Sequence, residues 1–189
     1  MKKNNFEELT QLEEYASNEE ISRIKSELLT SPEVNNSLVG TVVALSKNYA
    51  KSVLITNAEM VVDEQGLIMD AFIFAAANYV AQAAINKEFS VLIGSRCYFY
   101  APLKLGDILE LEAQALFDES SKKRDVKIVG FVKEIKIFEA NIQVVCTEDH
   151  IFKLKRPLSA SKPAEDASDI GKTNPEAMAA VVAHALNKT

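Results

Sequence analysis

One segment of the chain, DAFIFAAANYVAQAAIN from Asp70 to Asn86, limits the possible folds more than any other. Its spacing and its alanine content predict a helix, but this helix would be apolar nearly all the way round. Such a helix has to be covered on most of its sides, and strands are the only cover that the rest of the sequence offers. We therefore expect an α+β fold in which a curved antiparallel sheet wraps around one long central helix.

The expected helix carries a polar stripe of three side chains, Asn78, Gln82 and Asn86, which recur every four residues. A buried amide without a hydrogen-bond partner costs about 1–3 kcal/mol. We therefore expect this stripe to face the seam between two subunits. Asp70 is expected to begin the helix.

Segments that alternate in polarity or are rich in β-branched residues predict the strands of the sheet. Two of them, Thr41 to Ser46 and Lys51 to Thr56, precede the helix, and about four antiparallel strands follow it up to Leu154. In ILELEAQALF, which begins at Ile108, apolar residues alternate with acidic or amide residues, so one face of this strand should point into the core.

The segment VKIVGFVKEIKIF changes its apolar phase part of the way along. The apolar positions are Val126 and Ile128 at first, and Ile135 and Ile137 later. We expect this change to reflect a β-bulge near Gly130 within one bent, strongly twisted strand.

The two ends of the chain differ in pattern from its middle. Residues 1–36 are expected to form an N-terminal helical arm in two pieces, and the second piece starts with a capping-box pattern, SNEE, at Ser17 to Glu20. Residues 37–155 hold the sheet and the central helix. Residues 156–189 have the composition of a flexible linker, followed by a short C-terminal helix.

Composition and charge exclude several classes of function. A formal net charge of −6 does not suit a nucleic-acid-binding protein. No signal-peptide pattern and no apolar run long enough to cross a bilayer is visible, so we expect a cytoplasmic protein without membrane insertion. Cys97 and Cys146 are expected to be free thiols in strands, and neither His150 nor His184 has a companion at metal-ligand spacing, so no metal is expected.

Two segments resemble the acyl-thioester hot-dog superfamily. DEQGLIMDAFIFAAANYVAQAA is similar to its loop and central helix, and SRCYFYAPLKLGDILELEA to its recurrent strand of the form apolar-Phe-x-x-Pro-x-x-x-Gly-Asp. FAAANYVAQA resembles the central helix of the bacterial lipid-synthesis regulators that sense malonyl-CoA through a hot-dog domain. The order and lengths of the elements are also similar to those of flagella-coregulated hot-dog virulence proteins of campylobacters. The resemblance covers about Val39 to Leu154.

The resemblance implies a homodimer, or a dimer of dimers, whose sheets join edge to edge. It implies that fatty acyl thioesters of CoA or acyl-carrier protein bind at the subunit interface beside the helix, with no other cofactor. Hydrolysis by a thioesterase mechanism is one expectation, in lipid metabolism. The alternative is a non-catalytic acyl-CoA sensor or adaptor with a regulatory or virulence-related role, and a purely structural dimer is a third.

The sequence departs from these relatives at several points. It shows no DNA-binding domain before the hot-dog segment, and Tyr98 and Ala101 stand where the regulators have arginines. The loop DEQGLIMD lacks the histidine of many superfamily members, which argues against dehydration chemistry.

The candidate catalytic residues are Asp70 and Asn78. In hot-dog thioesterases a carboxylate acts as base or nucleophile, and the N–H groups at the helix start polarise the thioester carbonyl. By this resemblance Asp70 would activate water, and Asn78 would orient the water or the carbonyl. The simpler alternatives are that Asp70 only caps the helix and that Asn78 forms a hydrogen bond across the dimer seam.

The candidate ligand-binding residues have structural alternatives too. Gly66 would allow close backbone approach of the ligand or serve only a turn, and Gln82 leans toward a structural role. Arg96 lies in an otherwise apolar strand, where a buried or interfacial arginine needs an anionic partner.

A charged hairpin loop, SSKKRD, supplies the remaining candidates. Its three cations, Lys122, Lys123 and Arg124, would hold the phosphates of CoA. A loop that is simply solvated is the commoner explanation of such a charge run.

Overall fold

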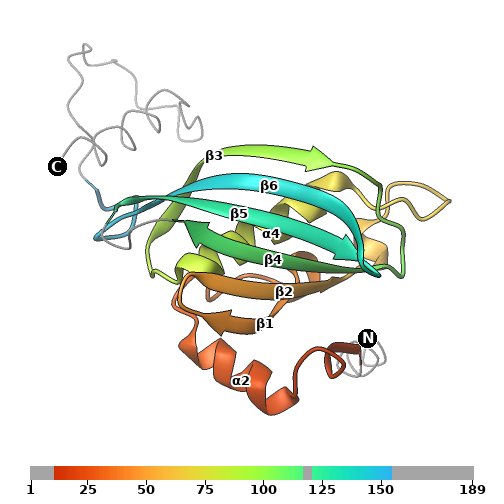
Figure 1. The fold of residues 1–189 in the computed structure, drawn as a ribbon, viewed down its shortest axis with the longest axis horizontal. Coiled ribbons are helices and arrows are strands. Elements are labelled where there is room, and N and C mark those ends of the chain that lie inside the picture. The colour runs from red at the N-terminus through yellow and green to blue at the C-terminus, as the bar shows by residue number, and fades with distance from the viewer. Residues whose placement is uncertain (1–10, 117–120, 155–189) are drawn as a thin grey trace, which may run out of the picture.

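A computed structural model describes residues 11–116 and 121–154 of the 189-residue chain. The expected C-terminal linker and helix, with His184, lie outside the described residues. The described part contains one six-stranded sheet in the order β1-β2-β4-β5-β6-β3, in which every pair is antiparallel (Figure 1). The strands are β1 (Thr41–Ser46), β2 (Tyr49–Ile55), β3 (Ser90–Phe99), β4 (Ile108–Leu116), β5 (Lys123–Val132) and β6 (Ile135–Cys146). The predicted α+β class and antiparallel sheet are confirmed.

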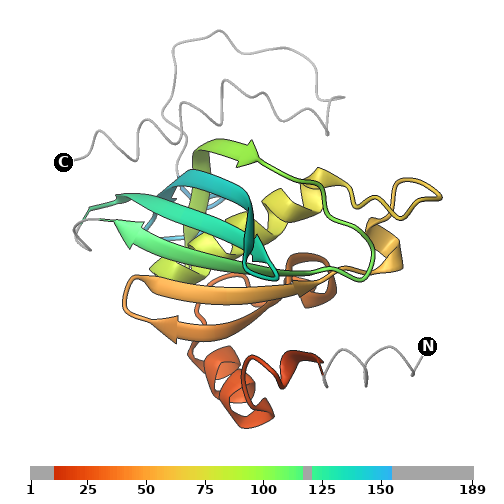
Figure 2. The ribbon, with the colours of Figure 1, turned by 45° about the vertical axis from the view of Figure 1, so that its right-hand side comes forward.

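Helix α4 (Asp70–Ile85) lies across one face of this sheet, and the strands curve over it (Figures 1 and 2). The side of α4 that faces the sheet is built mainly from alanines, because a methyl side chain lets a helix approach a sheet closely. Inward residues of the strands complete this core, and in β4 the predicted alternation places every second residue there. The fully buried residues of α4 and β4 include Ile73, Ala76, Ala77, Val80, Ala81, Leu109, Leu111 and Ala113.

The expectation of one bent strand around Gly130 is only partly right. A register shift between Gly130 and Phe131 is the predicted bulge. The chain then turns back at Lys133 and Glu134, whose φ angles of 47° and 67° are those of a two-residue hairpin turn. The strand therefore ends at Val132, and the change of apolar phase arises largely because the next strand begins there.

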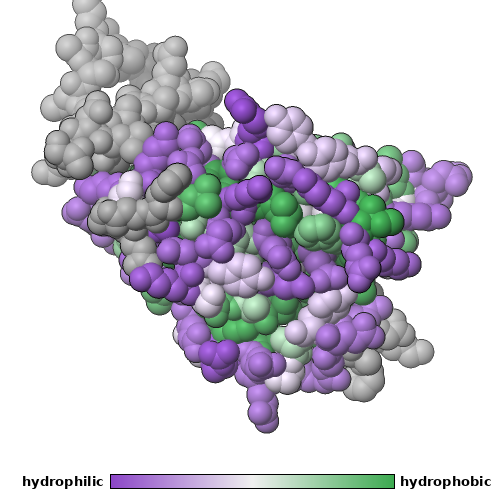
Figure 3. Space-filling model, viewed as in Figure 1, coloured by the Kyte–Doolittle hydropathy of each residue, from purple (hydrophilic) through white to green (hydrophobic). Residues whose placement is uncertain are grey.

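The sheet's other face is mostly polar where it is open, as the purple surface in Figure 3 shows. Lys51 on β2 forms ion pairs with Glu110 and Glu112 on β4, at 2.8 and 3.6 Å. Because this outer face is polar, the main apolar core lies on the other face of the sheet, against α4.

The N-terminal segment covers part of that outer face. Helix α2 (Asn18–Glu27) begins with the predicted capping box, since the Glu20 backbone N–H donates to Ser17 Oγ and the Glu20 carboxylate accepts from the Ser17 backbone N–H. The segment packs on β1 and β2 through a second apolar cluster. Two short helices follow, α3 (Asn36–Val39) and the 3₁₀ helix η1 (Ala58–Met60). The buried residues of the second cluster are Leu12, Ala16, Val43 and Val53.

Candidate functional site

The start of α4 is the first part of the candidate site. The N-cap residue is Met69, which has no side-chain hydrogen bond to the helix, and Asp70 follows as the first helical residue with its side chain exposed. The alternative that Asp70 caps the helix is therefore wrong. The N–H of Phe72 donates to Met69 O at 3.0 Å, but among the described residues no side chain caps this end, so the backbone N–H groups of Asp70 and Ala71 remain for a ligand. A carboxylate thus lies at the entrance to a set of hydrogen-bond donors.

The loop before α4 accounts for Gly66 as a turn glycine. Its φ is 80°, its N–H donates to Asp63 O at 3.1 Å, and Asp63 Oδ1 accepts from the N–H groups of Gln65 and Leu67, both at 3.0 Å. A Cβ at position 66 would lie 3.3 Å from Leu105 Cβ. This geometry requires a glycine whether or not a ligand binds here, so the role of Gly66 in the turn is enough to explain it.

The polar stripe of α4 is largely satisfied within the chain. Asn78 Oδ1 accepts from Gln82 Nε2 at 3.2 Å, and Gln82 Oε1 accepts from Ser90 Oγ at 3.0 Å. Asn86 accepts from the Leu29 N–H at 2.8 Å and donates to Glu27 O at 3.0 Å. Gln82 and Asn86 therefore bind their own chain, which corrects the expectation that the whole stripe faces another subunit.

Of the three residues of the stripe, Asn78 departs least from the expectation that the stripe faces another subunit. It is half-buried and contacts Gln82 one turn further along the helix.

Arg96 is exposed in the single chain, so of the two expected positions, buried or interfacial, the buried one is wrong. It pairs with Asn141 in the β3–β6 register, so alternation turns it to the outer face of the sheet. There it lines a pocket of about 530 Å³ with Asp125 and Gln143, and the Gln143 amide donates to Asp125 Oδ1 at 2.8 Å.

The three cations expected in one solvated loop do not form a cluster. Lys122 lies 3.4 Å from the carboxylate of Glu148, and Lys123 is exposed at the first position of β5. Arg124, the next residue, is only 2% exposed. The loop expectation is wrong for Arg124 because β5 begins before it and turns its side chain inward.

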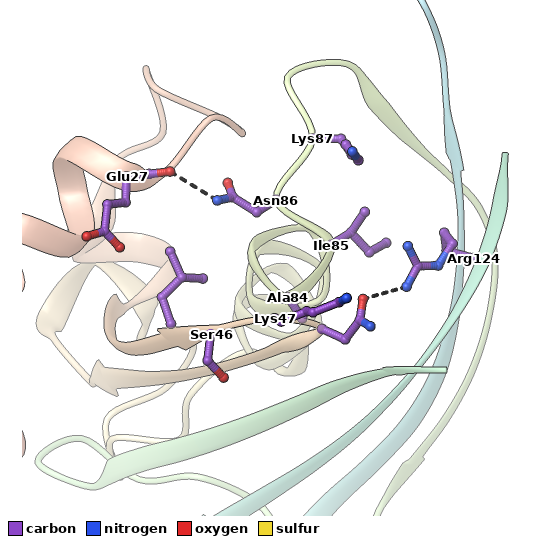
Figure 4. Close-up of a pocket in the computed structure, with 10 residues that line it drawn as sticks. Glu27, Ser46, Lys47, Ala84, Ile85, Asn86, Lys87 and Arg124 are labelled. Atoms are coloured by element: carbon purple, nitrogen blue, oxygen red, sulfur yellow. Dashed lines mark hydrogen bonds between the residues drawn. The ribbon is translucent and has the colours of Figure 1, made fainter. Parts of the chain in front are cut away.

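Arg124, on β5, lies beside the C-terminal end of α4, whereas Asp70 begins this helix, which is about 24 Å long for its 16 residues. Arg124 Nη2 donates to Asn48 Oδ1 at 2.7 Å, and its Nε has no hydrogen-bond partner in the part of the chain that the structure describes. It lines a pocket of about 340 Å³ with residues from the β1–β2 turn and from the end of α4 (Figure 4). The sequence holds a signal for this burial, because Arg124 shares the strand phase of Val126 and Ile128.

The single chain therefore does not bring the predicted residues into one cavity. Neither Asp70 nor Asn78 lines the 340 Å³ pocket, the 530 Å³ pocket, or a third one of about 230 Å³ between the N-terminal segment and Tyr79. Asp70 and Gly66 lie near one end of α4, and Arg124 lies near the other.

The two cysteines are free and half-buried in β3 and β6. Burial raises the pKa of both thiols, and at Cys146 the charges of Arg124 and Lys87 act in the opposite, lowering direction on that pKa. In the described ranges, no group of three or more metal-ligating side chains comes together. No helix in that part of the chain has the length and apolar character needed to span a membrane.

Sequence comparison with known proteins gives one relative that matches part of this chain. No protein-family model matches the chain. Methylthioribose-1-phosphate isomerase of Aquifex aeolicus is 33% identical over 120 residues, 64% of this chain, but the chain spans only 26% of that protein's length.

Solved structures match over most of their own length. The sigma28-regulated virulence protein Cj0977 of Campylobacter jejuni is 75% identical with a TM-score of 0.73, and the match covers 74% of this chain and 99% of that one. The uncharacterized protein PH1136 of Pyrococcus horikoshii is 31% identical with a TM-score of 0.64, over 67% and 96% of the two chains. The protein smu.793 of Streptococcus mutans, solved with acetyl CoA, shares the fold at 14% identity and a TM-score of 0.55, over 62% and 96%. With its antiparallel sheet, its helix α4 and these relatives, the chain belongs to the hot-dog fold, thioesterase-like superfamily that includes Cj0977.

Proposed function

We propose that the protein binds fatty acyl thioesters, presented by CoA or acyl-carrier protein, between two copies of the chain joined at β3. The observation that carries this proposal is the start of α4, where uncapped backbone N–H groups lie beside the exposed carboxylate of Asp70. Such N–H groups stabilise a carbonyl oxygen and, more strongly, an oxyanion.

Apolar side chains surround this helix start. Val62, Leu67, Met69 and Leu105 are between 38% and 53% exposed. Leu67 pairs with Lys104 in a β-bridge, so the loop before α4 and the loop after β3 present these side chains together. Grouped exposed apolar side chains are typical of a surface that binds a ligand or another protein. An acyl chain and a second subunit would both cover it.

Strand β3 supplies the edge for the second copy. Among the described strands it pairs only with β6, so its other edge carries backbone groups that are open to another strand. Tyr98 and Tyr100, at its end, are 49% and 56% exposed. Arg96, exposed on the same strand, would contact the phosphates of CoA.

The ligand class is supported by the relative solved with acetyl CoA. If the bound thioester is hydrolysed, Asp70 activates the water, Asn78 orients the water or the carbonyl, and the α4 N–H groups stabilise the oxyanion. Water adds to the carbonyl carbon and the C–S bond breaks, so the products are the free fatty acid and the thiol of CoA.

The competing function is an acyl-CoA sensor or adaptor without turnover. It is favoured by the absence of Asp70 and Asn78 from the three pockets described above. The similarity to a sigma28-regulated virulence protein supports a virulence-related role.

Acyl-CoAs of several chain lengths should raise the melting temperature, and the best ligand should then be assayed for release of free thiol. If the protein is a thioesterase, Asp70→Asn should lower the turnover of the acyl-CoA by about 10²-fold or more while ligand binding persists. Glu64→Gln, a matched change of an exposed carboxylate in the preceding loop, should leave turnover unchanged. Binding without thiol release would establish the sensor, and no stabilisation by any acyl-CoA would refute both functions.

A further inference from the structure

The pocket at the C-terminal end of α4 is built from three separate parts of the chain. The β1–β2 turn contributes Lys47 and Asn48, the end of α4 contributes Ile85 and the residues after it, and β5 contributes Arg124. Figure 4 shows Arg124, Lys47 and Lys87 around the pocket, with Lys87 on the segment that leaves the helix. The pocket holds about 340 Å³, enough for a small polar molecule.

Arg124 is incompletely satisfied in this position. The side chain is 98% buried and its Nη2 donates to the neutral amide of Asn48, while its Nε has no partner among the described residues. Within residues 11–116 and 121–154, no carboxylate lies within ion-pair distance of it. A buried guanidinium without an anion is strongly unfavourable, and the partial negative charge at a helix C-terminus offsets only part of that cost.

Among the described residues, the other charges around the pocket do not supply the missing anion. Glu27 lines it, but its carboxylate lies 2.9 Å from Arg23 and is half-exposed. Lys47 and Lys87 also line the pocket, and the charges of Lys87 and Arg124 both act on Cys146, where they lower the thiol pKa against the larger effect of burial. As far as residues 11–116 and 121–154 are concerned, the site therefore has a positive potential and, at Arg124 Nε, an N–H donor without a partner.

We propose that this pocket binds a phosphate group, held by the planar fork of Arg124 and the ammonium of Lys87. Arginine binds phosphate through paired N–H donors, so the free Nε and its neighbouring Nη match an oxyanion with two accessible oxygens. The site lies at the opposite end of α4 from Asp70 and does not depend on the acyl-thioester function. The phosphate is either free inorganic phosphate or the terminal group of a small phosphomonoester.

The test is a titration of the full-length protein with inorganic phosphate, and separately with adenosine monophosphate, against sodium chloride at matched ionic strength. Phosphate should raise the melting temperature in a saturable way that chloride does not reproduce, and isothermal titration calorimetry should give one site per chain. Tighter binding of the nucleotide than of inorganic phosphate would identify a phosphomonoester, and equal or weaker binding would identify free phosphate.

Three variants decide whether the response comes from this pocket. Arg124→Met should abolish the phosphate response and should not lower the melting temperature in phosphate-free buffer, because replacing a buried unpaired charge by an apolar side chain is neutral or stabilising. Lys87→Gln should weaken phosphate binding by about tenfold or more, since one charge-assisted contact is lost. Lys123→Met, the exposed neighbour on β5, should bind as the wild type does.

Two outcomes would overturn the proposal. One is the lack of any phosphate-specific response in the wild type. The other is a phosphate response that Arg124→Met and Lys87→Gln both retain, which would place the anion elsewhere. Neither outcome bears on acyl-CoA binding, which the Asp70→Asn experiment addresses separately.

Discussion

At the scale of single residues, the phase of a strand decides what a charged or small side chain does. Arg124 and Lys123 are neighbours in a charged run, yet β5 buries the first and exposes the second. The run predicted a loop because arginine is rarely fully buried. The phase shared by Arg124 with Val126 and Ile128 was visible in the sequence, but only the β5–β6 pairing shows that the strand begins before it.

Gly130 offers a test of how closely the sheet packs at the bulge. A Cβ at this position would lie 3.0 Å from Leu111 Cδ2 and 3.1 Å from Phe138 Cβ. Gly130→Ala should therefore lower the free energy of unfolding by about 1–3 kcal/mol through overpacking. Urea denaturation monitored by circular dichroism measures this change.

The control is Gly94→Ala in β3, where the nearest atom to an added Cβ is Gln143 Oε1 at 3.5 Å. This variant should stay within about 0.5 kcal/mol of the wild type. Equal stability of the two variants would show that the bulge can accommodate a methyl group.

At the scale of elements, the end of α4 connects the N-terminal segment to the hot-dog core through hydrogen bonds. Asn86 ends α4 in a left-handed conformation, with φ of 48°, and its side chain binds backbone groups of Glu27 and Leu29. One residue thus terminates a helix and holds a second element. Periodicity predicted the polar stripe, but the partners lie 57 and 59 residues away in sequence, beyond the reach of any local pattern.

Two substitutions separate these roles of Asn86. Asn86→Gly keeps the left-handed conformation and removes both hydrogen bonds, so it should lower the free energy of unfolding by about 1–2 kcal/mol. Asn86→Ala removes the same bonds and adds left-handed strain, so it should lower stability by about a further 1 kcal/mol.

Hydrogen exchange provides the measurement at the level of the element. In both variants the amides of α2 should exchange faster, while those of β4 and β5 change less. If α2 exchange is unaltered, Asn86 does not hold the N-terminal segment.

At the scale of the whole molecule, the single chain has a complete core but an incomplete candidate site. The sheet and α4 bury a continuous apolar cluster, whereas the start of α4 and the β3 edge remain exposed. A second copy at β3 is the arrangement that would cover both, and it would place the seam beside Asn78.

Light scattering of a charged variant tests this assembly. Met69 is 51% exposed at the start of α4, so Met69→Lys should shift the protein from dimer toward monomer by placing a charge in the proposed interface. Ile135→Lys, at a site that is 67% exposed at the tip of the β5–β6 hairpin, should leave the mass unchanged. A monomeric wild type, or equal masses for both variants, would contradict the proposed dimer.

The sequence by itself determined the local features of this protein: the apolar helix at Asp70, the alternating strands and the capping box at Ser17. These follow from the side-chain period of each element, which is a property of neighbouring residues. Tertiary structure decided that Met69 rather than Asp70 occupies the N-cap position of α4, that Arg124 is buried and that Gln82 and Asn86 bind their own chain. Those outcomes depend on which distant segments meet, because burial and hydrogen-bond partners are set by strand pairing and packing rather than by local spacing.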